Sequence, residues 1–186
     1  WKPLALVPLL ALLVWPFIGS SSTWLTLTVA GLAMGMIIFI IASGLTLVFG
    51  LMDVLNFGHG VFIALGAFVA TTVLGLMGDW TGSQDIWRNL LAVFPAMLVA
   101  MLVSGAVGLA FERFIVRPVY GQHLKQILIT MGGMIIGEEL IKVVWGPAQI
   151  ALPLPEGLRG AVLLGDAAIE KYRLLAVIVG LAVFAI

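Results

Sequence analysis

Residues 52–60 read MDVLNFGHG and interrupt an apolar stretch from 24 to 78 in which Asp53 is the single formally charged side chain. A bilayer core is about 30 Å thick, and a helix needs roughly 20 apolar residues to cross it. The stretch is therefore long enough for two crossings joined by a short break. Polar groups at membrane depth are costly unless they face water, protein or a solute. The sequence thus predicts a membrane protein with a broken helix near residues 50–60, which contains Asp53, Asn56 and His59.

The composition supports this class of protein. Of the 186 residues, 62% are hydrophobic and 10% are charged, whereas soluble domains carry about 25% charged residues. Nine basic and nine acidic side chains cancel, so nothing indicates nucleic acid or an anionic surface as partner. The absence of cysteine excludes disulfides and thiolate metal sites. His59 and His123 are far apart in sequence and make a poor metal site, so we predict neither catalytic nor metal-binding residues.

Apolar segments recur along the chain, separated by short polar or proline-rich connections. They cover about residues 4–18, 24–48, 60–77, 90–111, 127–145 and 174 onward. The first also fits a signal-peptide core, because of its length and the preceding Lys2. Glycine pairs four residues apart, such as Gly133 with Gly137, let helices approach closely in lipid. We therefore expect an all-α, polytopic bundle of transmembrane helices that forms a single domain over residues 1–186.

The connection over residues 146–171 differs from the other connections. Pro147, Pro153 and Pro155 exclude a continuous helix there. The short apolar pieces around Gly160 and Gly165 fit a small hairpin.

Basic residues predict the orientation of the bundle, because Lys and Arg in short loops stay cytoplasmic. The loop after the 90–111 segment carries Arg113, Arg117 and Lys125, so we expect it inside. The 146–173 connection is then outside, although basic residues of its own oppose that placement.

The run from Asn56 to Gly60 is the strongest candidate for a functional site. Glycines on both sides of His59 allow the helix to break and let a solute or another helix come close. The start of the following helix exposes unpaired N–H groups and a partial positive charge, which suit a carboxylate. We therefore predict that Asn56, Phe57, Gly58, His59 and Gly60 lie along a solute path. A helix-capping role is the structural alternative for Asn56.

Asp53 and Glu139 are candidate polar supports of this path. Asp53 also fits a solvated cap at the membrane edge. Glu138 and Lys142 are one turn apart and can pair along the helix, whereas Glu139 points to another face and has no evident partner. Because Trp145 marks the interface nearby, snorkelling toward the headgroups is favoured over a transport role for Glu138.

Residues 43–68, SGLTLVFGLMDVLNFGHGVFIALGAF, resemble the permease subunits of branched-chain amino acid ABC importers. That family has a Gly-Leu-x-Leu-x-x-Gly stretch, then Asn-Phe-(Ala/Gly)-His-Gly and Leu-Gly-Ala-(Tyr/Phe), which match residues 44–50, 56–60 and 65–68. Residues 112–121, ERFIVRPVYG, resemble the family's Glu-Arg-x-x-(Tyr/Phe)-Arg-Pro-Leu-Arg-Gly, with Tyr120 in place of the usual basic residue. The match is to the subunit type that carries Asn-Phe-x-His-Gly.

The resemblance implies a permease subunit, not an enzyme, in a bacterial inner membrane. Such a subunit forms half of a channel with a sister permease, is driven by two ATPase subunits that bind the ATP, and receives solute from a periplasmic binding protein. The chain itself then needs no cofactor. Branched-chain amino acids are the leading solutes, and urea or short amides are the alternatives.

The resemblance also implies that the chain is the N-terminal part of a longer permease, because the loop that docks on the ATPase would follow Ile186. The rival from another class is an ion-coupled secondary transporter or channel. In that case Asp53, His59 and Glu139 would relay protons or bind an ion.

Overall fold

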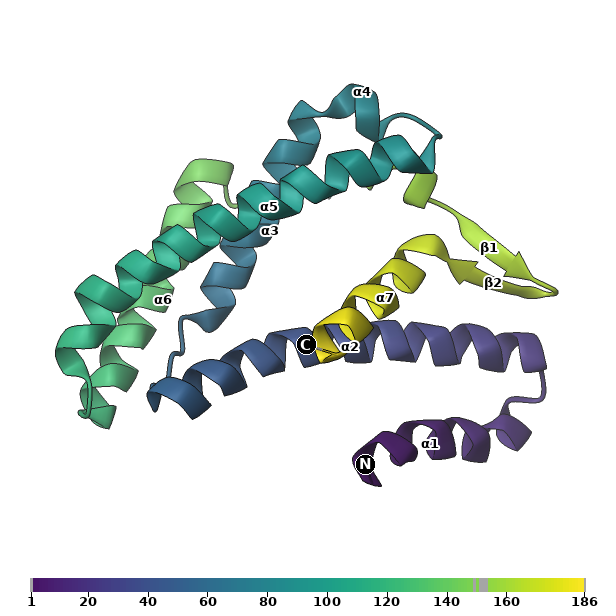
Figure 1. Cartoon of the computed structure of the whole chain (residues 1–186), viewed down its shortest axis with the longest axis horizontal. Helices are drawn as coiled ribbons and strands as arrows, with labels where there is room; N and C mark the ends of the chain where they lie inside the picture. Colours follow the sequence, from purple (N-terminus) through teal and green to yellow (C-terminus); the bar gives the residue numbers. More distant parts are fainter. Residues whose placement is uncertain (1, 149, 151–153, 186) are drawn as a thin grey trace. The chain divides into compact units, whose positions relative to one another are not determined.

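A computed structural model describes residues 2–148, 150 and 154–185 of the chain (Figure 1). The chain forms two compact units, one of Trp1–Ile40 with Arg159–Ile186 and the other of Ile41–Leu158. Helix α2 (Ser21–Met52) contributes its N-terminal part to the first unit and its last turns to the second.

The first unit contains α1 (Lys2–Ile18), most of α2, the strands β1 (Ala161–Leu164) and β2 (Ala167–Glu170), and α7 (Lys171–Ala185). Trp24 on α2 contacts α1 in two ways. Its Nε1–H donates to the Ala11 carbonyl at 2.6 Å, and the centroid of its ring lies 5.8 Å from that of Trp15. On α7, Gly180 leaves the space that the Met36 side chain fills. Aromatic and glycine positions therefore define the helix contacts of this unit.

The hairpin predicted near residues 160–165 is confirmed. β1 and β2 are antiparallel, and Leu164 is opposite Ala167, so Gly165 and Asp166 form the turn. Gly165 has φ of 63°, a left-handed conformation that short hairpin turns require and glycine adopts freely. Pro153, one of the prolines that separate this hairpin from the preceding helix, lies outside the described residues.

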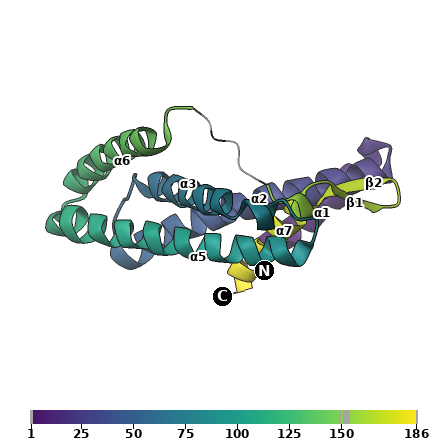
Figure 2. The same ribbon diagram turned by 90° about the horizontal axis from the view of Figure 1, so that it is seen from above.

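The second unit is built on three long helices. Figure 2 shows α3 (His59–Leu76) between α5 (Ile86–Phe111) and α6 (His123–Trp145), and α3 contacts both neighbours. The connecting elements are α4 (Gly78–Thr81), a π-helical turn η1 (Glu112–Val116), and the 3₁₀ turns η2 (Arg117–Val119) and η3 (Glu156–Leu158). The predicted apolar segments coincide with the long helices to within a few residues, and α4 lies in one of the polar connections between them.

Two glycines bring α6 close to its neighbours. A Cβ atom on Gly133 would overlap the Phe111 ring, and one on Gly137 would lie 2.6 Å from Val61 Cγ1. The Phe111 ring packs edge-on against Phe62, with centroids 5.4 Å apart. The prediction that this glycine pair allows close helix packing is therefore confirmed.

Asn89 is the polar centre at the opposite end of α5. Its side chain is completely buried. The amide Nδ2 donates to the carbonyls of Trp80 at 2.8 Å and Ser83 at 2.9 Å, and Oδ1 accepts from the N–H of Gly157 at 2.6 Å. Because a buried amide is stable only when its hydrogen bonds are made, Asn89 fixes both the α4 loop and η3 against α5.

Three helical stretches are long and apolar enough to cross a membrane, within the described ranges: Ser21–Met52, His59–Leu76 and Ile86–Val119. Helix α6 is also long, but it carries Lys125, Glu138, Glu139 and Lys142. The predicted all-α, polytopic class is confirmed, and the hairpin is the single sheet in the part of the chain that the structure describes.

The predicted pairing of Glu138 with Lys142 is wrong. Lys142 Nζ instead donates to Glu139 Oε1 at 2.6 Å, and Glu138 is exposed. Residues three apart on a helix are neighbours just as residues four apart are, so Lys142 had two carboxylates within reach. The prediction that Glu139 lacks a partner fails for the same reason.

Candidate functional site

The predicted break is confirmed: α2 ends at Met52 and α3 begins at His59. Asp53 ends α2 with a left-handed backbone, φ 52°, and its N–H donates to the Phe49 carbonyl at 2.9 Å. The glycines were expected to supply the unusual backbone, but Gly58 has φ −74° and ψ −1°. Asp is among the residues that tolerate the left-handed region, because its short side chain bonds locally. The chain therefore turns out of the helix at Asp53 rather than at a glycine.

Asn56 holds the turn that leads into α3. Its Oδ1 accepts from the N–H of Gly58 at 3.0 Å, and its carbonyl accepts from the N–H of His59 at 3.3 Å. The Val61 N–H is also taken, by the Gly58 carbonyl at 3.0 Å. Asn56 thus acts through an Asx-type turn, and the start of α3 has fewer free N–H groups for a carboxylate than the sequence suggested.

Thr130 on α6 forms hydrogen bonds with the backbone of the break. It is completely buried, and its Oγ1 accepts from the Phe57 N–H at 3.4 Å. The same hydroxyl has three acceptors within reach, the Leu55 carbonyl at 3.2 Å and, on its own helix, the carbonyls of Gln126 at 2.8 Å and Ile127 at 3.2 Å. A Cβ on Gly58 would lie 3.6 Å from the Thr130 carbonyl. Helix α6 therefore fixes the middle of the break.

His59 packs the start of α3 against the last turns of α2. Its Nε2 lies 3.3 Å from the Ile41 carbonyl, and its ring occupies the space beside Gly44, where a Cβ would lie 3.1 Å from Cε1. Phe57 is half exposed, and a Cβ on Gly60 would meet open space. The five predicted path residues therefore differ in role, since Gly58 is buried whereas Phe57 and Gly60 are accessible.

An open cavity of about 550 Å³ adjoins the break. We call it the break cavity, and its lining comprises Val48, Met52, Val54, Asn56, His59, Phe62, Ile63, Gly66, Ala100, Met101, Ser104, Gly105, Gly108, Phe111, Glu112 and Val116. Its side-chain polar groups come from Asn56, His59, Ser104 and Glu112. Ser104 is already engaged, since its hydroxyl donates to the Phe62 carbonyl at 2.8 Å. The break cavity thus combines apolar walls with a few hydrogen-bonding groups, as small-molecule sites do.

Glu112 stands where α5 changes into the π-helical turn η1. Its Oε1 accepts from the Tyr120 hydroxyl at 2.5 Å. Desolvation and this hydrogen bond raise the pKa of Tyr120, which lies in the loop beyond the helix, to about 12. Tyr120 therefore provides Glu112 with a neutral donor, at the position where the resemblance places a basic residue.

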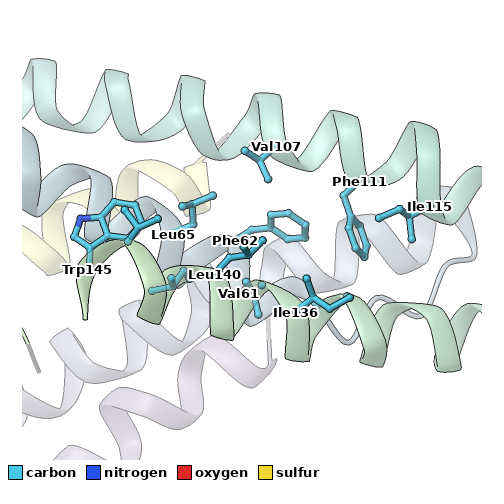
Figure 3. Close-up of a pocket in the computed structure, with 14 residues that line it drawn as sticks. Val61, Phe62, Leu65, Val107, Phe111, Ile115, Ile136, Leu140 and Trp145 are labelled. Atoms are coloured by element: carbon cyan, nitrogen blue, oxygen red, sulfur yellow. The ribbon is translucent and has the colours of Figure 1, made fainter. Parts of the chain in front are cut away.

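A second cavity, of about 390 Å³, lies between α3, α5 and α6 (Figure 3). Its walls are apolar side chains, among them Phe62, Phe111 and Leu140. The indole N–H of Trp145, at one end, already donates to Thr72 Oγ1 at 2.8 Å. This apolar cavity offers no free side-chain group to a polar solute, so the break cavity is the better candidate for a solute site.

The two candidate polar supports lie in different places. Asp53 Oδ2 is 3.9 Å from His123 Nε2, and both side chains are exposed. This pair puts the break at the same end of the unit as the basic loop before α6. Glu139 is separated from Thr130 by about 14 Å of helical rise and pairs with Lys142. In the described residues no cluster of three or more His, Cys, Asp or Glu is arranged to hold a metal ion.

Three site residues escaped prediction from the sequence: Ser104, Glu112 and Thr130. A signal existed for Thr130. It follows Gln126 by four positions in an apolar helix, and the structure buries both on one face of α6, at 0% and 1% exposure. Polar residues at helical spacing within an apolar segment indicate such a buried contact face.

Sequence comparisons identify the family of the chain. The sequence model of a family described as branched-chain amino acid transport system / permease component matches residues 27–151. The chain belongs to this family. The matched range includes the break together with α3, α5 and α6.

Curated relatives carry matching names. The high-affinity branched-chain amino acid transport system permease protein BraD of Pseudomonas aeruginosa is 35% identical over 111 residues, 58% of this chain and 34% of the relative. The permease protein LivH of the corresponding system in Escherichia coli K12 is 30% identical over 127 residues, 66% of this chain and 39% of the relative. The chain thus spans little more than a third of these relatives. No solved structure gives a significant match.

Family membership confirms several predictions from the sequence. A permease component is a transport subunit rather than an enzyme. The bacterial relatives and the apolar helices confirm a multi-pass protein of the bacterial inner membrane.

Proposed function

We propose that the chain is part of a permease subunit of an ATP-driven importer of branched-chain amino acids or related small polar solutes. The observation that carries the proposal is the match of the permease family to residues 27–151, a range that includes the broken helix. The names of the BraD and LivH relatives support branched-chain amino acids as the solute class.

In this proposal the solute path passes the break, where Asn56, Phe57, His59 and Gly60 are accessible and Gly58 is packed beneath them. The break cavity supports this placement. Its apolar wall, which includes Ile63 and Met101, suits an aliphatic side chain. Its polar groups, Asn56, His59 and Glu112, suit the charged ends of an amino acid, and a carboxylate such as Glu112 pairs with an ammonium group.

The proposed partners are a sister permease, two ATPase subunits and a periplasmic solute-binding protein. The ATP is bound by the ATPase subunits, and the permease uses no cofactor. In this assembly Asp53 ends α2 and pairs with His123 at the break, whereas Glu139 pairs with Lys142 farther along α6.

The decisive experiment measures uptake in proteoliposomes that contain the full-length permease, its sister permease and both ATPases, with the binding protein supplied on one side. Uptake of radiolabelled leucine should require ATP and the binding protein. The matched control carries an ATPase whose Walker A lysine is replaced, because this lysine contacts the ATP phosphates, and it should abolish uptake.

Two outcomes would change the proposal. Uptake by the permease alone, driven by a proton or sodium gradient, would overturn the ATP-driven assignment. ATP-dependent uptake of radiolabelled urea or of a short amide, without uptake of leucine, isoleucine or valine, would retain the importer and replace its solute.

A further inference from the structure

Thr130 makes two side-chain hydrogen bonds to the break, and its backbone carbonyl lies beside Gly58. Its hydroxyl accepts from the Phe57 N–H and lies 3.2 Å from the Leu55 carbonyl, and its own carbonyl lies 3.6 Å from the position of a Cβ on Gly58. The residue is completely buried, so water cannot replace these contacts. The backbone at Leu55 and Phe57 is therefore held by a single side chain of α6.

The hydroxyl of Thr130 has one proton and three nearby acceptors. Two belong to its own helix, the carbonyls of Gln126 at 2.8 Å and Ile127 at 3.2 Å, and the third is the Leu55 carbonyl of the break. Threonine in a helix commonly bonds back to the carbonyl four residues earlier. Here the same oxygen also accepts from the break, so it joins the two segments whichever carbonyl receives the proton.

We propose that Thr130 is a positioning residue that clamps the break to α6 and so fixes the shape of the break cavity. The expected effect of the clamp on transport rests on the proposed function. The clamp itself is a structural property, and it can be measured without a transport assay. Because Asn56 and His59 flank the clamped residues, a displacement of α6 would move both of these cavity groups together with it.

The test uses a full-length permease that is otherwise free of cysteine, assembled with its partners. Val54 lines the break cavity and is 2% exposed, so a thiol introduced by Val54→Cys should react slowly with a methanethiosulfonate reagent. Adding Thr130→Val keeps the side-chain shape and removes the hydroxyl, which should raise the reaction rate about tenfold, the equivalent of one buried hydrogen bond. Thr130→Ser should keep the rate within about twofold of the parent.

The matched control is Thr71→Val on α3. Thr71 also bonds back to its own helix, to the Ala67 carbonyl at 2.8 Å, but it does not contact the break, so its loss should leave the reaction of the Val54→Cys thiol unchanged. Equal protection of this thiol in Thr130→Val and in the parent would overturn the clamp, as would a similar rise in Thr71→Val.

Uptake measured on the same variants separates the clamp from the transport proposal. Thr130→Val should lower maximal uptake at least fivefold with little change in the half-saturating concentration of loaded binding protein, and Thr130→Ser should restore it. Raised reactivity with normal uptake supports the clamp and overturns the assignment of the break to the solute path. Copurification of the ATPases with each variant checks that assembly is intact.

Discussion

Helix α6 allows a direct test of helix packing in the second unit. It carries two adjacent glycines, of which Gly133 lies against a neighbouring side chain and Gly132 faces open space. A Cβ on Gly133 would overlap the Phe111 ring, whereas a Cβ on Gly132 would meet no other atom within 4 Å in the described chain. The ring cannot turn aside freely, since it packs edge-on against Phe62 at 5.4 Å. We predict that Gly133→Ala destabilises the protein and that Gly132→Ala does not.

The magnitude follows from two opposing terms. Replacing glycine by alanine inside a helix gains about 1 kcal/mol from helix propensity at either position. Overpacking a tight contact costs about 1–3 kcal/mol, and the direct overlap with a rigid ring places Gly133 in the upper part of that range. The net loss for Gly133→Ala is therefore about 1–2 kcal/mol, against a gain of up to about 1 kcal/mol for Gly132→Ala.

Thermal unfolding of the full-length permease in detergent measures this difference. At about 2–4 °C per kcal/mol, Gly133→Ala should lower the midpoint by about 2–8 °C and Gly132→Ala should leave it unchanged or raise it slightly. Gly133→Ala combined with Phe111→Leu, which removes the ring, should recover part of the loss. Equal midpoints for the two alanine variants would refute the packing argument for α6.

Four further predictions concern other parts of the chain. Gly58→Leu should lose most uptake while the subunit still copurifies with its ATPases, because Gly58 is buried under the break; normal uptake would show that the break has only a packing role. Asn89→Leu should lower the free energy of unfolding by roughly 3 kcal/mol in denaturant titrations, since it leaves buried backbone groups unpaired. The raised pKa of Tyr120 means that its hydrogen bond stabilises the fold fully below pH 10 and loses this effect as pH rises through about 12; Tyr120→Phe should therefore lower the thermal midpoint equally at every pH in the neutral range. Gln122→Cys should react with an impermeant thiol reagent in inverted vesicles and not in intact cells, and the reverse result would invert the predicted topology.

The sequence by itself determined the class of the protein and the position of its central feature. Long apolar segments have few alternatives to membrane helices, because a bilayer leaves backbone groups no other partners. The motif around Asn56 and His59 identified both the broken helix and the family, and the family match over residues 27–151 agrees with it. The hairpin at Gly165 was also predictable, since a turn of this kind depends on local backbone conformation.

Only the tertiary structure decided which groups meet. The contact between Thr130 and the Leu55–Phe57 backbone joins residues far apart in the chain, and no local pattern specifies such a partner. The same holds for Glu112 in the break cavity and for the choice of Lys142 between two carboxylates that helical spacing makes equally accessible. Asp53 rather than a glycine ends α2. The left-handed turn forms where the helix stops, and there the Asp53 N–H donates to the Phe49 carbonyl of the last helical turn. Sequence periodicity specifies the faces of helices, whereas the pairing of those faces depends on side-chain volumes and hydrogen bonds that are satisfied only when the helices pack.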